Sequence, residues 1–186
     1  MARKTRIGPL SASLFVAVSL AAGAALLPAQ ADDNPDVKAR IELMKALGNS
    51  MKTMGPMFKG TVDYDPAAVR EAAAAIEIRS GIELTKLFPE GSTTDKSAAL
   101  PAIWTDWERF TKLADDLGFY AQGLVNSAGN DRTAPAASSG GTLGDAAPKA
   151  LTTDPAELAA MSPDVVFQAL GKTCGTCHTD FRKEKK

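Results

Sequence analysis

The sequence predicts an all-α fold, an antiparallel four-helix bundle. Long stretches carry an apolar residue every three or four positions, and three of them begin at Asn, Asp or Ser followed by proline. That pattern is typical of capped amphipathic helices. No stretch shows the sustained alternation of apolar and polar residues that a half-buried strand requires.

The first helix is expected after Asn34-Pro35, because an apolar series runs from there to Phe58, with a break at Gly55-Pro56 or at Gly60. The second is expected after Asp65-Pro66, and its apolar series continues to just before Pro89. Its alanine-rich middle would let a neighbouring helix approach closely.

The third helix is expected from Pro101 to Leu124, in a rhythm close to a heptad, which suits long antiparallel packing. The fourth starts at Ser162-Pro163 and runs to Phe181, after a short helical turn at Asp154-Pro155. Between them, residues 126–153 are rich in Ala, Gly, Ser, Thr and Pro and are expected to form a flexible loop.

Residues 1–31 are expected to be a secretory signal peptide. Three basic residues precede an apolar run at 14–27 and a small-x-small cleavage site at 29–31. The run is shorter than the roughly 20 residues that a bilayer-spanning helix needs. The mature chain is therefore expected to begin at Asp32, in the periplasm, with no membrane span.

Residues 32–186 are expected to form a single domain. Without the leader, 18 Lys and Arg face 22 Asp and Glu, a formal net charge of −4. A role in binding nucleic acid therefore has no electrostatic support.

Both cysteines and the only histidine lie in the segment Cys174-Gly175-Thr176-Cys177-His178. On a helix the positions i, i+3 and i+4 share one face. Cys-x-x-Cys-His is the attachment signature of one covalent haem c, with a thioether at each of Cys174 and Cys177 and His178 as the proximal iron ligand. Export agrees, because c-type haem is attached outside the cytoplasm.

Three other interpretations compete for this segment. A structural zinc site needs four ligands, and no further Cys or His remains in the chain. A thioredoxin-like pair would open a helix after a strand, whereas here a full helix is expected to precede the motif. A structural disulfide would close a very small loop and leave His178 unexplained.

Any sixth iron ligand must come from earlier in the chain, because the residues after His178 contain neither Met nor His. In a bundle the first helix can lie beside the last. The candidates are Met44, Met51, Met54, Met57 and Met161.

Several segments together resemble the class II cytochromes c, which include cytochrome c prime and its low-spin, methionine-ligated relatives. The resemblance covers nearly all of residues 32–186 and departs at the 126–153 loop, which is longer than usual in such proteins. The segments are residues 39–52 (ARIELMKALGNSMK), 87–92 (LFPEGS), 101–104 (PAIW), 171–174 (GKTC) and the stretch from there to Phe181-Arg182.

The resemblance implies a bundle with haem against the first, third and fourth helices. Arg182 matches a basic residue near the proximal face of the haem. Arg40 matches an arginine that approaches the haem propionates, and a plain surface cation is the competing interpretation. Met44 falls at the distal position, where the low-spin relatives have a ligating methionine and cytochrome c prime usually has an apolar blocking residue.

The expected function is that of a periplasmic monohaem electron carrier, not an enzyme, with His178 and Met44 as axial ligands and periplasmic redox proteins as partners. The alternative is a five-coordinate cytochrome c prime that binds nitric oxide or carbon monoxide, with Met44 as core filler. A thiol-disulfide oxidoreductase using Cys174 and Cys177 is a more distant alternative. The resemblance also implies a possible homodimer through the first two helices.

Overall fold

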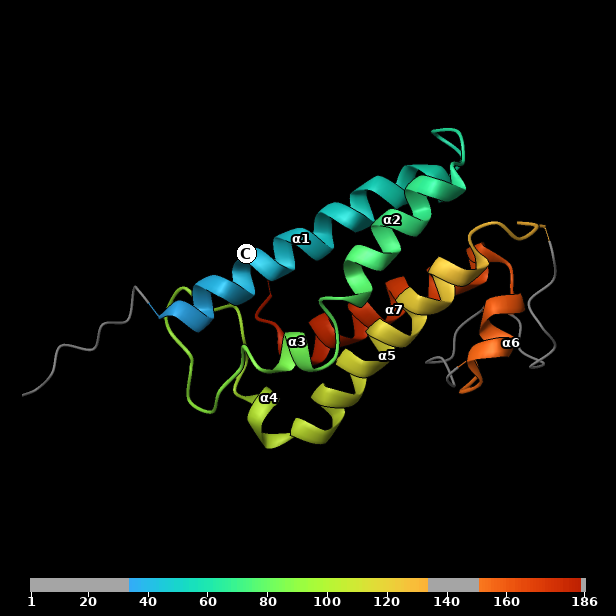
Figure 1. Ribbon diagram of the computed structural model, residues 1–186. Coiled ribbons are helices and arrows are strands. Elements are labelled where there is room, and N and C mark those ends of the chain that lie inside the picture. Colours follow the sequence, from blue (N-terminus) through green and yellow to red (C-terminus); the bar gives the residue numbers. More distant parts are fainter. Residues whose placement is uncertain (1–33, 134–150, 185–186) are drawn as a thin grey trace, which may run out of the picture.

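The computed structural model describes residues 34–133 and 151–184 of the chain. The expected signal peptide at 1–31 and residues 134–150 of the expected loop lie outside the described residues. Within those two ranges there is no strand, so the all-α prediction is confirmed. The helices are α1 (Pro35–Phe58), α2 (Pro66–Glu77), α3 (Ile82–Thr85), α4 (Ala102–Thr105), α5 (Trp107–Ser127), α6 (Pro155–Ala160) and α7 (Pro163–Phe181) (Figure 1).

The helix starts follow from local chemistry, as the sequence predicts. Asn34 accepts from the backbone N–H of Asp36 at 2.9 Å, and Asp65, Asp154 and Ser162 cap their helices in the same way two residues ahead. A proline follows each cap, where its missing N–H costs nothing. The short turn expected at Asp154-Pro155 is α6.

Two expected helices are interrupted. The predicted second helix divides into α2 and α3 at Gly81, whose φ of 56° leaves the helical region. There the Gly81 N–H donates to the carbonyl of Ala114 in α5 at 2.9 Å, a tertiary bond that a continuous helix would lose. The predicted third helix divides into α4 and α5 at Asp106, with φ −132° and ψ 54°.

Of the two break points expected in the first helix, one lies inside α1 and does not end it. Pro56 lies inside α1, which ends at Phe58, and the chain turns at Gly60 with a φ of 72°. The break at Gly60 is therefore right, and Pro56 costs α1 one hydrogen bond without ending it.

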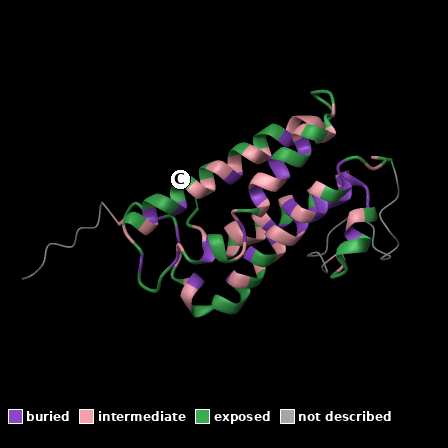
Figure 2. Cartoon of the chain, viewed as in Figure 1, coloured by how far each residue is buried: buried purple, intermediate pink, exposed green. Residues whose placement is uncertain are grey.

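The long helices form the predicted bundle. α1 packs on α2, α2 on α5 and α5 on α7, while α6 packs on α5 (Figure 1). Buried side chains line the contacts between these helices, and much of the outward side of α1 is exposed (Figure 2). By contrast, α1 and α7 make hardly any close backbone approach. Side chains meet across this pair instead.

Two side-chain contacts fix α1 and α7 antiparallel. The ring of Phe58 stacks on that of Phe167, with 4.1 Å between centroids and 10° between planes. Seven residues earlier on α1, the Cε atom of Met51 lies 3.9 Å from the position that a Cβ on Gly171 would take. Moving toward the start of α1 therefore means moving toward the end of α7.

The end of α7 lies near the start of α1 because both contact the segment 97–100. The N–H of Leu100 donates to the carbonyl of Phe181 at 2.9 Å, and that of Lys183 to Ala98 at 2.8 Å. Ser97 accepts from Arg40 of α1 at 3.3 Å. The C-terminal segment therefore runs back toward the first half of α1 (Figure 1).

Candidate functional site

Cys174, Cys177 and His178 lie on α7, and all three are partly buried. The row Phe167, Gly171, Cys174, His178 steps by four, three and four residues, so its side chains lie along one side of the helix. The first two members of this row face Phe58 and Met51 of α1. The whole row, including His178, is therefore on the side of α7 that faces α1.

Met44 shares a helix face with Met51, since seven residues are nearly two full turns. His178 is likewise seven residues beyond Gly171, in the opposite direction. Because the helices are antiparallel and Met51 faces Gly171, this register brings Met44 level with His178. Met44 is partly buried and packs against the core.

The other candidate methionines are less suited to reach the same place. Met54 is completely buried in the core, and Met161 is 1% exposed. Met161 also precedes His178 by 17 residues, about 25 Å along a helix. Met57 lies beyond Met54, close to the end of α1. Met51, opposite Gly171, is about 10 Å along the helix from Met44.

The two thiols are free and are held in their protonated form. Burial raises the pKa of Cys174, and it raises the pKa of Cys177 to about 11, with Cys174 and Asp180 acting in the same direction. A thiol-disulfide enzyme needs the opposite, a cysteine whose pKa is depressed by positive charge or a helix N-terminus. The local chemistry therefore disfavours the thiol-disulfide interpretation.

Arg40 is 4% exposed, so the surface-cation interpretation is wrong. Its two terminal nitrogens donate to Ser92 Oγ at 2.6 Å and to Ser97 Oγ at 3.3 Å, and its guanidinium lies 4.4 Å from the ring centroid of Phe88. Burial lowers the pKa of the Arg40 guanidinium, and nearby Asp36 opposes that effect. The sequence does not predict these partners, because they are more than forty residues from Arg40.

Among the described residues, two buried guanidinium nitrogens have no hydrogen-bond acceptor, Nε of Arg40 and Nε of Arg182. Arg182 follows α7 directly and forms a β-bridge with Ala99, two residues from Ser97. Both arginines therefore lie at the end of the bundle that holds Cys174, Cys177 and His178. A buried N–H of a guanidinium that lacks an acceptor favours an anionic partner.

These residues fit the haem c expected from the sequence. The α7 face supplies two thiols and one imidazole, the two arginines supply donors for carboxylates, and Met44 supplies a thioether on the opposite helix. Among the described side chains, no group of three or more Cys, His, Asp and Glu is arranged to hold a bare metal ion. The zinc interpretation therefore has no support in the fold.

Asp180 was not singled out from the sequence. It accepts from the guanidinium of Arg109 in α5 at 2.9 and 2.6 Å. Phe110, which follows Arg109 in α5, packs edge-on against Phe181, with 5.4 Å between ring centroids. Together these contacts hold the end of α7, and with it His178, against α5.

Within the two described ranges, no helix has the length and hydropathy that a membrane span requires.

Comparisons with known proteins show the family of this chain. The sequence profile of the family described as cytochrome c′ matches residues 36–149. Cytochrome c-556 of Agrobacterium fabrum is 32% identical over 150 residues, 81% of this chain and 82% of the relative. Cytochrome c′ of Rhodopseudomonas palustris is 30% identical over 153 residues, 80% of this chain and 82% of the relative.

Among solved structures, a cytochrome c′ from Rhodopseudomonas palustris superposes with a TM-score of 0.59 at 27% identity, covering 83% of this chain and all of the other. The range matched by the family profile ends before Cys174. The arrangement of Cys174, Cys177 and His178 on α7 is therefore independent of that match.

Proposed function

Because this chain belongs to the cytochrome c′ family and has haem c as its cofactor, we propose that it is a periplasmic single-electron carrier with His178 and Met44 as axial ligands of the iron. One observation carries the proposal. The register fixed by Met51 against Gly171 brings Met44 level with His178, on the facing side of the bundle.

In this proposal the functional residues at the end of α7 have separate roles. Cys174 and Cys177 hold the haem as thioethers, and their partly buried side chains lie one turn apart on the face that also carries His178. His178 supplies the fifth ligand. Asp180, paired with Arg109, limits how far this last turn of α7 can rotate.

Arg40 and Arg182 bind the carboxylates of the haem through donors that have no acceptor within the described chain. Ser92 and Ser97 hold Arg40 in a fixed orientation, and the ring of Phe88 lies against its guanidinium. Because the cation is already buried and oriented, little side-chain entropy is lost when it binds a carboxylate.

Haem bound here supplies an iron that alternates between the ferric and ferrous states. A thioether ligand from Met44 favours the ferrous state and raises the potential. Met44 is partly buried and packs against the core. A ligand that is fixed in advance suits electron transfer, because the site then changes little between oxidation states.

A five-coordinate site that binds nitric oxide or carbon monoxide is the second candidate function. The observation that favours it is the near-equal similarity to a cytochrome c′, at 30% identity, and to a cytochrome c-556, at 32%. In that case Met44 would fill the core beside an open iron face, as methionine often does.

The absorption spectrum of the ferric protein at neutral pH tests the choice. We expect a low-spin spectrum with a methionine-to-iron charge-transfer band that disappears in Met44→Ala and persists in Met51→Ala. Met51 is the matched control, since it lies on the same face of α1 and is also partly buried. A high-spin spectrum of the unsubstituted protein would favour the gas-binding alternative.

The export of the protein and the covalent attachment of the haem need a separate measurement. We expect the intact mass of protein exported from a Gram-negative host to correspond to a chain that begins at Asp32 and carries one haem. A chain without the added haem mass would contradict attachment at Cys174 and Cys177, and a retained leader would contradict the expected cleavage.

A further inference from the structure

Four lysines on α1 recur at intervals of seven residues. They are Lys38, Lys45, Lys52 and Lys59, called here the lysine row, and all four are exposed. A spacing of seven drifts by only about 20° per repeat on a helix, so the four ammonium groups follow one another along one side of α1. Each of the middle two directly follows a methionine of the face that meets α7, Met44 or Met51.

The positive charge of the lysine row is greatest toward the end of α1. Lys45 pairs with Glu42 at 2.8 Å, and both side chains are well exposed. From Lys52 to Lys59 the helix has no acidic residue. No carboxylate of the described residues forms an ion pair with either of these two lysines. Residues 35–59 carry five basic and two acidic side chains, +3 in a mature chain of −4.

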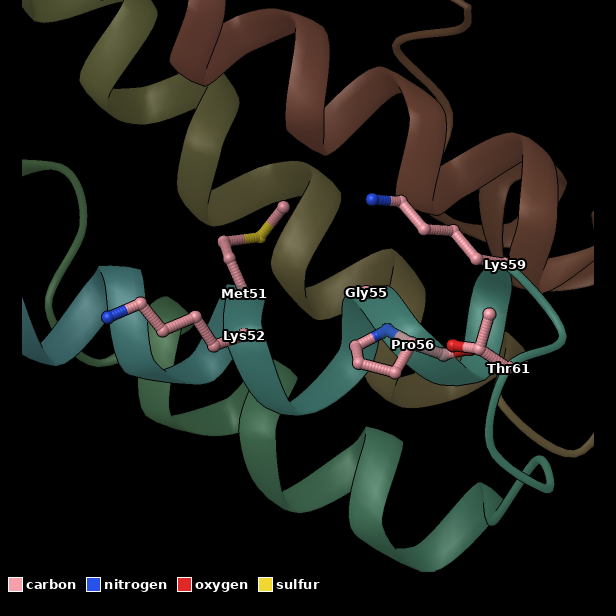
Figure 3. Close-up of a pocket in the computed structure, with 6 residues that line it drawn as sticks. All are labelled: Met51, Lys52, Gly55, Pro56, Lys59 and Thr61. Atoms are coloured by element: carbon pink, nitrogen blue, oxygen red, sulfur yellow. The ribbon is translucent and has the colours of Figure 1, made fainter.

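A groove of about 560 Å³ opens at this same part of α1, lined by Met51, Lys52, Gly55, Pro56, Lys59 and Thr61. No carboxylate lines it. Figure 3 shows Met51 reaching from α1 toward α7, while Lys52 extends along α1 toward its first half. The groove therefore shares one side chain, Met51, with the face of α1 that meets α7.

We propose that the lysine row and this groove form the docking surface for an acidic electron-transfer protein. The inference rests on the proposed electron-carrier function. Positive charge concentrated on one side of a protein of negative net charge orients an acidic partner toward that side and raises its association rate. The partner then lies beside α1, and the near end of the groove, at Met51, is about 10 Å along the helix from Met44.

An acidic protein fits this surface better than an anionic membrane does. A helix that binds a membrane surface places large apolar side chains beside its lysines. On α1, Ile41 at 38% exposure is the one large hydrophobic residue that is well exposed. The surface therefore offers charge and a shallow groove, but little apolar area to insert.

Reduced flavodoxin, an acidic one-electron donor, serves as the probe. One electron passes from the flavin hydroquinone to the ferric haem, which leaves the flavin as its semiquinone and the haem iron ferrous. The measurements are the second-order rate of haem reduction in the stopped-flow spectrometer and the Kd of oxidised flavodoxin by calorimetry, each at several ionic strengths. The calorimetric value does not depend on electron transfer.

The test compares two double variants of equal net charge. Lys52→Gln/Lys59→Gln removes two charges from the groove, and Lys86→Gln/Lys112→Gln removes two elsewhere. The pairs are matched in position, because Lys59 and Lys86 are each the C-cap of a helix, while Lys52 and Lys112 each lie inside one. The control also removes two exposed ion pairs, Lys86 with Glu83 and Lys112 with Asp116.

We expect the groove variant to lower the rate and weaken binding at least about fivefold at low ionic strength, and the control to change either by less than about twofold. Near 1 M salt, where the screening length is about 3 Å, the variants should converge. Equal effects of the two pairs would overturn the proposed location. Binding to phosphatidylglycerol vesicles that needs Lys52 and Lys59, without any effect on flavodoxin, would assign the surface to a membrane instead.

Failure of this inference and failure of the proposed function are distinguishable. A five-coordinate haem also accepts an electron, so a high-spin spectrum would overturn the role of Met44 and still leave the docking result readable. Conversely, a low-spin spectrum, together with equal losses of reduction rate and binding in both double variants, would overturn the docking surface alone.

Discussion

Met51 and Gly171 meet across the pair of helices α1 and α7, with the methionine Cε atom 3.9 Å from the position that a β-carbon on the glycine would occupy. That separation is an ordinary van der Waals contact. It leaves room for a methyl group on Gly171, and it indicates the height of Met44 relative to His178.

Substitutions at Gly171 test this contact. Gly171→Ala adds a methyl group that fits and removes a helix-interior glycine, so we expect it to stabilise the protein by up to about 1 kcal/mol. Gly171→Leu would collide with Met51 and cost about 1–3 kcal/mol. Thermal unfolding of the haem protein measures both. A destabilising Gly171→Ala would contradict the register, and so would a fully tolerated Gly171→Leu.

A second glycine lies in a much tighter place. A β-carbon on Gly123 of α5 would lie 2.2 Å from Cδ2 of Leu158 in α6. Gly123→Ala must displace Leu158, so we expect a loss of about 1–3 kcal/mol in urea unfolding. Gly48→Ala on α1 is the control, because no atom lies within 4 Å of its β-carbon position. If Gly123→Ala were as well tolerated as the control, α6 would not rest on α5 as described.

The buried cation Arg40 predicts opposite results with and without haem. In the haem-free chain, Arg40→Met removes a buried charge whose hydrogen-bond partners are two neutral serine hydroxyls, so we expect little loss of stability or a small gain. In the haem protein the same change removes a charge-assisted hydrogen bond, and we expect a loss of about 1.5–3 kcal/mol. Thermal unfolding of the two forms gives the comparison.

The control for Arg40 is Arg109, whose partner Asp180 lies near the protein surface. Arg109→Met should cost less than about 1 kcal/mol in either form, because exposed ion pairs contribute little. If Arg40→Met had the same effect with and without haem, Arg40 would be a structural residue and not a haem contact.

The thiols of the haem-free chain predict a pH dependence. Burial raises the pKa of Cys174, and that of Cys177 is raised to about 11, so the folded state disfavours the thiolates. The unfolded chain ionises near pH 8.5. This contribution to stability is therefore complete below about pH 8.5 and is lost as the pH rises toward 11.

Alkylation by iodoacetamide measures the same effect directly. At pH 8 we expect both thiols to react at least about tenfold more slowly in the folded chain than in urea, with Cys177 the slower of the two. Equal rates in the folded and unfolded chains would contradict the burial of these thiols.

Local signals in the sequence were enough to predict where α1, α2 and α7 begin and which residues of α7 share a face. Asn34, Asp65 and Ser162 cap their helices through bonds that span only two residues, so nothing distant enters the prediction. The spacing of Cys174, Cys177 and His178 likewise depends only on the pitch of one helix.

The interruptions and the partners of Arg40 could not be predicted in this way. Gly81 leaves its helix to donate to Ala114, and Arg40 reaches Ser92 and Ser97, contacts that exist only after the chain has folded. The ranking of the methionines needs tertiary information too. Met51 and Met54 lie on one apolar stripe of the sequence, and only the bundle turns Met51 toward α7 and Met54 into the core.

The stacked rings of Phe58 and Phe167 have a consequence far from where they lie. Met44 and Met51 are a heptad apart on α1, as Gly171 and His178 are on α7, so sliding one helix past the other by two turns would exchange one methionine for the other opposite the histidine. Met51 would then face His178. The aromatic stack at one end and Arg40 with Ser97 at the other oppose that slide. The choice of iron ligand is thus a matter of helix phase, held by side chains that are not themselves iron ligands.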